Sequence, residues 1–204
     1  MTYFNEDDIE KLHHLYRINL INSCSGYKSA NLIGTKSQAG IENVAVFSSV
    51  THIGSSPAMF GFFMRPTTVI RNTYENIKST GIFTINHIHK KIIEDAHHTS
   101  AKYDATISEF DVTGLNSEYK NNFQAPFVKD APVKLAMQFV EEYNITANNT
   151  ILLIGKIIGL HINDNLIEKD GFVDLSKAEV ASINGLDGYT VADNRVRLGY
   201  QRPK

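Results

Sequence analysis

The sequence predicts a mainly β fold whose antiparallel strands close fully or partly into a barrel. Short β-rich runs follow one another along the chain, and short polar turns join most of them. Strands joined in this way pair antiparallel, and closure removes exposed sheet edges. The chain has 204 residues and a hydrophobic fraction of 42%, enough for one large core without disulfides. We therefore expect a single domain over residues 1–204.

The expected elements follow from hydrophobic spacing and turn residues. A helix is expected at Asn5–Asn19 within an N-terminal helical segment, 1–20, because Ile9, Leu12 and Tyr16 recur at helical spacing. A polar turn at 37–42, with one glycine, predicts a hairpin between the first two strands. Strands are expected, in order, at residues 30–36, 44–51, 58–64, 82–88, 133–143 and 150–162.

Two connections are expected to be helical. In the first, 72–80, Asn72 is placed to cap the helix, Glu75 to complete a capping box, and Gly81 to end it. The second runs over 90–98. The polar stretch 100–124 is expected to be a long loop, and 163–204 an irregular C-terminal wrap with a short strand.

Composition excludes several classes of protein. The net charge of −2 gives no general attraction for nucleic acid or acidic lipid. Cys24 is the only cysteine, so no intrachain disulfide can form, and a cytoplasmic location is the simple expectation. The acidic start lacks the regions of a signal peptide, and no apolar run approaches the roughly 20 residues of a membrane span.

A basic, hydroxyl-rich turn precedes the helix expected at 72–80. Free N–H groups at a helix start, hydroxyl donors and guanidinium groups together favour an anion such as phosphate. The alternative is an ordinary proline turn with a capped helix and solvated arginines. The phosphate candidates are Arg65, Thr67, Thr68, Arg71 and Thr73.

Small hydroxyls end the apolar strand that begins near Asn43. Ser48 and Ser49 would let a flat ring approach the backbone and form hydrogen bonds with it. The alternative is a solvent-facing strand end, which is a common position for serine.

The eight histidines do not predict a metal site. His87 and His89 would share one strand face, but no motif supplies a complete ligand set, so no metal is expected. His161 lies on an expected strand, either structural or facing a pocket. No nucleophile elbow, phosphate-binding loop or dinucleotide fingerprint is present, Cys24 has no evident base, and we name no catalytic residue.

Taken in order, these segments resemble the flavin reductase-like family of FMN-binding split-barrel proteins. The family's threonine strand, G-x-x-N turn and A-x-F/S-S segment match Thr35, Gly40 with Asn43, and Ala45 with Phe47-Ser48-Ser49. Its later strands, loop and C-terminal signature match further segments, and the likeness covers roughly residues 20 to 203. These segments are Pro57, Arg65, Thr73-Tyr74-Glu75-Asn76-Ile77, Gly81-Ile82-Phe83-Thr84-Ile85-Asn86, His98-Thr99-Ser100, Ser108-Glu109-Phe110, Ile154-Gly155-Lys156 with His161, Gly185-Leu186-Asp187-Gly188-Tyr189 and Arg197 to Pro203.

The resemblance implies an antiparallel Greek-key split β-barrel with flanking helices, working as a homodimer with flavin near the interface. It implies FMN as cofactor, with FAD as the alternative, and NAD(P)H as electron donor. Ser48, Ser49 and the backbone of 43–47, which includes Asn43, Ala45 and Phe47, would contact the ring and ribityl chain. The five phosphate candidates would surround the phosphate, and His98 and Ser100 would face the open side of the ring.

The function implied is hydride transfer from NAD(P)H to flavin. In such chemistry the cofactor carries the reaction and the protein positions it, which agrees with the lack of a catalytic dyad. Two alternatives stay open at this point: a non-catalytic flavin-binding electron carrier of the same fold, and an interaction module whose hydroxyl-rich groove binds another anion.

Overall fold

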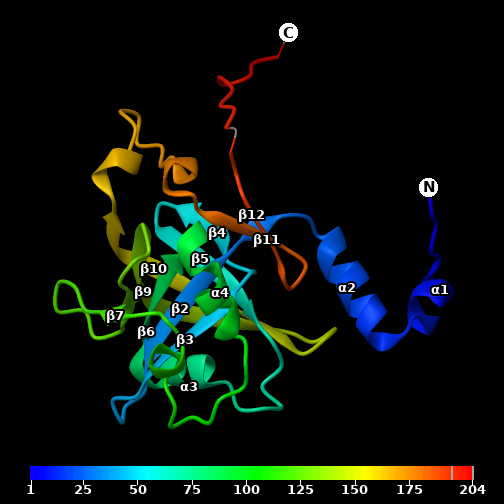
Figure 1. The fold of residues 1–204 in the computed structure, drawn as a ribbon, viewed down its shortest axis with the longest axis horizontal. Coiled ribbons are helices and arrows are strands. Elements are labelled where there is room, and N and C mark those ends of the chain that lie inside the picture. Colours follow the sequence, from blue (N-terminus) through cyan, green and yellow to red (C-terminus); the bar gives the residue numbers. More distant parts are fainter. Residues whose placement is uncertain (194, 204) are drawn as a thin grey trace.

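A seven-stranded antiparallel sheet forms the centre of the computed structural model, which describes residues 1–193 and 195–203 (Figure 1). The strand order is β3-β2-β6-β9-β10-β5-β4, which confirms the prediction of a mainly β, antiparallel fold. The strands are β2 (Asn31–Lys36), β3 (Glu42–Phe47), β4 (Thr51–Ser55), β5 (Ala58–Met64), β6 (Ile82–His87), β9 (Val133–Ile145) and β10 (Thr150–Ile162).

The sheet is split between β3 and β4, which are its two edges although they follow each other in sequence. The Ser49 hydroxyl spans the connection between them: it donates to the carbonyl of Phe63 on β5 at 3.1 Å and accepts from the Phe63 N–H at 3.0 Å. The edge of β3 is covered elsewhere, because the Val44 N–H donates to the buried carboxylate of Glu109. Both contacts satisfy edge groups that would otherwise invite another strand.

Strand β2, which lies next to the edge strand β3, is buried on both faces. Leu32 packs into a cluster with the helices outside the sheet, and Ile33 packs into the barrel interior. Gly34 follows them, and a Cβ at that position would lie 2.3 Å from the carbonyl oxygen of Pro126. Alternating side chains thus build two cores, one on each side of the same strand.

Short helices and small sheets surround this sheet. The smaller sheets are β1-β11-β12 and β7-β8. The remaining elements are α1 (Glu6–Lys11), α2 (His14–Cys24), β1 (Lys28–Ser29), α3 (Asn72–Thr80), η1 (Lys90–Ile92), α4 (Ile93–His98), α5 (Glu109–Val112), β7 (Ser117–Glu118), β8 (Phe127–Val128), η2 (Asp164–Leu166), η3 (Leu175–Ala178), β11 (Ala181–Asn184) and β12 (Gly188–Val191).

Several predicted elements are confirmed at their predicted bounds. They include β5, α3 and β10, and the helix expected at 90–98 forms with a 3₁₀ first turn. Gly81 ends α3 in the left-handed conformation, with φ of 72°, as its position predicted. The C-terminal wrap contains two short strands, β11 and β12, rather than one. The expectation of a single domain over 1–204 stays a prediction.

The single helix predicted at Asn5–Asn19 is wrong. The backbone turns extended at Leu12 and His13, with ψ of 142° and 136°, and α1 and α2 lie on either side of that break. Neither helix buries any residue, and both project away from the strands (Figure 1). The apolar spacing that predicted one helix therefore does not correspond to a face packed on the barrel.

Two further predictions, a strand and a loop, are wrong in part. The strand expected at 44–51 stops at Phe47, because the chain turns at Ser48 to cross the split, and β4 begins at Thr51. The loop expected at 100–124 contains α5 and β7.

Within residues 1–193 and 195–203, no helix combines the length and hydropathy needed to cross a membrane.

Candidate functional site

The N-terminus of α3 has no side-chain cap. Arg71 is the N-cap residue, with extended backbone angles of −123° and 99°, and no side chain accepts a hydrogen bond from the first turn. The predicted capping box of Asn72 and Glu75 is therefore wrong, because Asn72 lies inside the first turn. The N–H groups of that turn, with the positive end of the helix dipole, are left for an acceptor from outside the chain.

Arg71 adds an unpaired cation to this helix start. The residue is half-buried, and its buried Nε has no hydrogen-bond partner in the part of the chain that the structure describes. Among the same residues, neither Arg65 nor Arg71 forms an ion pair with a carboxylate. A buried guanidinium nitrogen without a partner is costly, and an oxyanion would satisfy it.

The other predicted phosphate residues lie on the same segment. Arg65 directly follows the last residue of β5, and Arg65, Thr67 and Thr68 are exposed on the loop that leads to α3. The loop and the first turn of α3 make one corner of the molecule. We call residues 65–73 the phosphate corner.

A buried polar network anchors this corner to the sheet. The Asn43 side chain donates to Thr35 Oγ1 at 3.2 Å and to Thr73 Oγ1 at 3.1 Å, and Asn76 donates to Thr35 Oγ1 at 3.1 Å. All four side chains are buried. Asn43 therefore positions the first turn of α3, while the Thr73 hydroxyl still has its own hydrogen to donate.

The predicted ring-side residues lie at the end of β3. Ser48 is half-buried and has no hydrogen bond recorded among the described residues, whereas the Ser49 hydroxyl is fully engaged by Phe63. The Phe47 ring packs edge-on against Phe62, with centroids 5.1 Å apart, and Ala45 is half-buried. Of the two serines, Ser48 is therefore the one whose hydroxyl is free of partners among the described residues. The Ser49–Phe63 bonds bring this strand end beside Arg65.

His98 and Ser100 lie at the end of α4, and both are exposed. His98 Nε2 lies 2.7 Å from the Tyr103 hydroxyl, and the two rings stack with an interplanar angle of 16°. No hydrogen bond among the described residues ties either one to the phosphate corner. Their predicted position over the ring stays a prediction.

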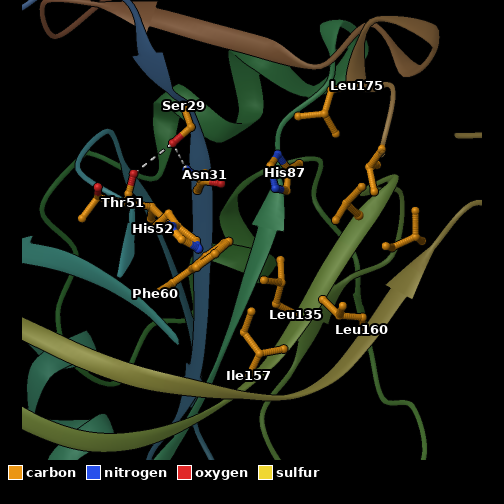
Figure 2. Close-up of a pocket in the computed structure, with 14 residues that line it drawn as sticks. Ser29, Asn31, Thr51, His52, Phe60, His87, Leu135, Ile157, Leu160 and Leu175 are labelled. Atoms are coloured by element: carbon orange, nitrogen blue, oxygen red, sulfur yellow. Dashed lines mark hydrogen bonds between the residues drawn. The ribbon is translucent and has the colours of Figure 1, made fainter. Parts of the chain in front are cut away.

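A cavity of about 410 Å³ within the barrel was not predicted from the sequence (Figure 2). Asn31 and His87 line it, together with apolar side chains from several strands. Burial lowers the pKa of His87 to about 4, so its imidazole is neutral at physiological pH. The sequence offered no signal for this cavity, since its lining comes from segments far apart in the chain.

The remaining histidines do not gather into a metal site. Within residues 1–193 and 195–203, no group of three histidine, cysteine or acidic side chains is placed to hold an ion. The His161 ring packs edge-on against Phe127, with centroids 5.3 Å apart. Burial, with Lys120 and Lys134 nearby, lowers its pKa. His161 does not line the cavity, so of its two expected roles the contact with Phe127 favours the structural one.

The fold is a split antiparallel β-barrel, and its phosphate corner combines an uncapped helix N-terminus with an arginine whose buried Nε has no partner among the described residues. The chain belongs to the flavin reductase like family: the sequence model of the flavin reductase like domain matches residues 26–176. This membership confirms the resemblance inferred from the sequence and connects the protein with flavin-related oxidoreductases.

Solved structures agree with this assignment. A candidate flavin reductase with a split barrel domain, from Shewanella frigidimarina, is 43% identical, covers 98% of this chain and 100% of its own, and superposes with a TM-score of 0.95. It confirms the split-barrel prediction. Nitrilotriacetate monooxygenase component B from Bacillus cereus shares the fold at 17% identity, with a TM-score of 0.84 and coverage of 97% and 98%.

A relative with sequence similarity but no assigned function is also known. An uncharacterised protein of Methanothermobacter thermautotrophicus is 28% identical over 170 residues, which is 79% of this chain and 78% of that protein.

Proposed function

We propose that this protein is an FMN-binding oxidoreductase that passes a hydride from NAD(P)H to flavin. The observation that carries the proposal is the open N-terminus of α3 beside the unpartnered Arg71 Nε, in a chain of the flavin reductase like family. Backbone N–H groups, a helix dipole and a guanidinium are the donors that a phosphate monoester needs.

The phosphate would be held by this corner. Arg71 supplies the charge nearest the helix, and Arg65, Thr67 and Thr68 approach from the exposed loop. Thr73 donates its hydroxyl hydrogen while Asn43 holds that hydroxyl in place. The donors outnumber any acceptors at this position, which favours FMN over an unphosphorylated flavin.

The ring and ribityl chain would lie along the end of β3. Ser48 supplies a free hydroxyl, and the backbone near Ala45 and Phe47 gives further contacts. Ser49 fixes the distance between this strand end and the phosphate corner through its two bonds to Phe63. The protein's contribution is then placement of the cofactor.

Bound flavin supplies the redox chemistry itself, by accepting a hydride from the reduced nicotinamide. The chain's residues would bind the cofactor and orient it. No side chain is required to donate or remove a proton for this transfer, in agreement with the absence of a catalytic dyad from the sequence.

We also propose that the protein forms a homodimer with the flavin near the interface. Helix α2 exposes apolar side chains to 62% at Leu15, 54% at Tyr16 and 49% at Ile21, and buries none. A short helix without packing is marginal in water, and a second copy of the chain would cover this face. Sedimentation of the full chain tests this; a monomer with full flavin affinity contradicts it.

The absorbance spectrum of the purified protein, before and after addition of FMN, tests flavin binding. Saturable uptake of FMN with a flavin spectrum is the expected result, and colourless protein that takes up no FMN contradicts the proposal. Oxidation of NADH and NADPH, followed with and without free flavin, then separates a reductase from a flavin carrier. A flavin-loaded protein that oxidises neither nucleotide would be a carrier.

A further inference from the structure

The cavity within the barrel is of a size that takes a small ligand. Its volume of about 410 Å³ lies at the lower end of the range of ligand pockets. Its lining comes from β1, β2, β4, β5, β6, β9, β10, the connection between β3 and β4, and the C-terminal wrap, and includes no residue of the phosphate corner (Figure 2). Leu160, which is 54% exposed, is part of its wall, so the cavity is open to solvent there.

Apolar side chains form most of the cavity wall. Leu135 and Ile157 line it from β9 and β10, and Phe60 lies across from them on β5. The Phe60 ring meets His52 edge-on, with centroids 6.0 Å apart. Such walls favour a flat ring, which gains from both apolar burial and aromatic contact.

Two polar atoms in the cavity lining lack partners. Asn31 is 1% exposed; its amide nitrogen donates to Ser29 Oγ at 2.9 Å, but its Oδ1 accepts no hydrogen bond from any residue that the structure describes. The buried Nδ1 of His87 is likewise without a partner there. A buried acceptor without a donor is costly, so a ligand that brings an O–H or N–H to Asn31 is favoured.

The cavity also lacks a permanently charged side chain. No lysine, arginine, aspartate or glutamate lines it, and of the two histidines that do, His87 is neutral and His52 is exposed. A charged ligand would lose its hydration without gaining a counter-ion. The ligand is therefore uncharged.

We propose that this cavity is a binding site for a small, uncharged aromatic molecule that carries a hydroxyl group, with a phenol as the simplest example. The hydroxyl donates to Asn31 Oδ1, and the ring lies among Phe60, Leu135 and Ile157. The proposal depends on the cavity alone and not on the proposed flavin chemistry.

Calorimetric titration of the full chain with three probes tests it. The probes are p-cresol, toluene, which lacks the hydroxyl, and 4-methylbenzoate, which carries a charge. We expect saturable 1:1 binding of p-cresol, toluene binding weaker by about three- to tenfold because Asn31 stays unpaired, and no binding of 4-methylbenzoate. Failure of p-cresol to bind, or equal binding of p-cresol and toluene, overturns the proposal.

A pair of variants locates the site. Asn31→Leu should remove the preference for p-cresol over toluene and keep toluene binding. Asn184→Leu is the matched control, since Asn184 also has a buried, unpartnered Oδ1 but does not line the cavity; it should keep the preference. An unchanged preference in folded Asn31→Leu overturns the assignment, and the preference of the wild-type protein is a test that needs no variant.

These results are distinct from the test of flavin binding. Colourless protein that binds p-cresol contradicts only the flavin proposal, and yellow protein that does not bind it contradicts only this one. A segment of a second copy that fills the cavity would exclude both neutral probes, which also overturns the proposal.

Discussion

The phosphate corner and the cavity lie near opposite ends of strand β2, the corner beside Thr35 and the cavity at Asn31, and they differ in charge, exposure and polar satisfaction. The corner is an exposed loop with two arginines and an open helix start. The cavity is a largely apolar space lined by two histidines, the neutral His87 and the exposed His52, and by one unpaired amide oxygen. We therefore expect the corner to favour negatively charged ligands and the cavity to favour uncharged ones.

The difference teaches where the fold can tolerate charge. Solvent around the corner screens added or lost charges, so changes there affect ligand binding more than stability. Asn31 in the cavity wall is 1% exposed, so a charge placed there is screened far less and acts on the folded state itself. Four predictions test this contrast, beginning with the largest effect.

A carboxylate placed in the cavity should destabilise the fold strongly. Asn31→Asp should lower the free energy of unfolding by about 3 kcal/mol at pH 8, because the charge is buried without a cation. Arg65→Glu, a larger charge change at an exposed position, should alter it by less than about 0.5 kcal/mol. Urea denaturation of both variants measures the difference; equal losses would mean that the two regions do not differ in this way.

The neutral His87 should make stability depend on pH. Its folded pKa of about 4 lies below the unfolded value of about 6.5, so its contribution is complete above pH 6.5 and is lost as the pH falls toward 4. Acidification from pH 7 to 4.5 should cost the wild-type protein about 2 kcal/mol more than it costs His87→Gln. Urea denaturation of both proteins across this pH range measures the difference. Equal pH dependence of the two unfolding free energies would mean that the His87 imidazole is in contact with water.

The network under the corner should contribute to stability through Asn43. Asn43→Ala removes the hydrogen bonds to Thr35 and Thr73 and should lower the free energy of unfolding by about 1–2 kcal/mol. Asn19→Ala, at an exposed position on α2, is the control and should change it little. Thermal and urea unfolding of both variants measure this, and a loss no greater than that of the control would exclude an anchoring role.

The smallest expected effect is that of salt, which should weaken ligand binding at the phosphate corner but not in the cavity. Raising the salt concentration from 50 to 500 mM should weaken FMN binding by about threefold, because screening acts on the exposed Arg65 and the half-buried Arg71. Binding of p-cresol should stay constant, since no charge takes part. Titrations at both concentrations compare the slopes. Salt-independent FMN binding would indicate that Arg65 and Arg71 do not contact the phosphate.

Features set by local chemistry could be predicted from the sequence. The proline turn, the apolar alternation and Gly81 fixed β5, α3 and the two long strands at or near their observed bounds. The hydroxyls and arginines of the corner stand within one short segment, so their proximity was readable as well. These elements depend on neighbours in the chain.

Features that depend on distant contacts could not be predicted. The capping box failed because Asn72 lies within the first turn while Arg71 takes the cap position. The predicted end of the strand over 44–51 was wrong because the chain crosses the split after Phe47, where the Ser49 hydroxyl bonds to Phe63. The cavity could not be predicted for a similar reason. Asn31 and His87 are separated by more than fifty residues in the sequence, and only the order of strands in the sheet brings both into its lining.

The affinities of FMN and riboflavin for the wild-type protein and for Arg71→Ala test the central claim most directly. Riboflavin lacks the phosphate and keeps the ring and ribityl chain. If the corner holds the phosphate, Arg71→Ala should weaken FMN binding by about tenfold or more, and riboflavin binding should change little. Equal losses for the two flavins, or no loss for FMN, would contradict the account.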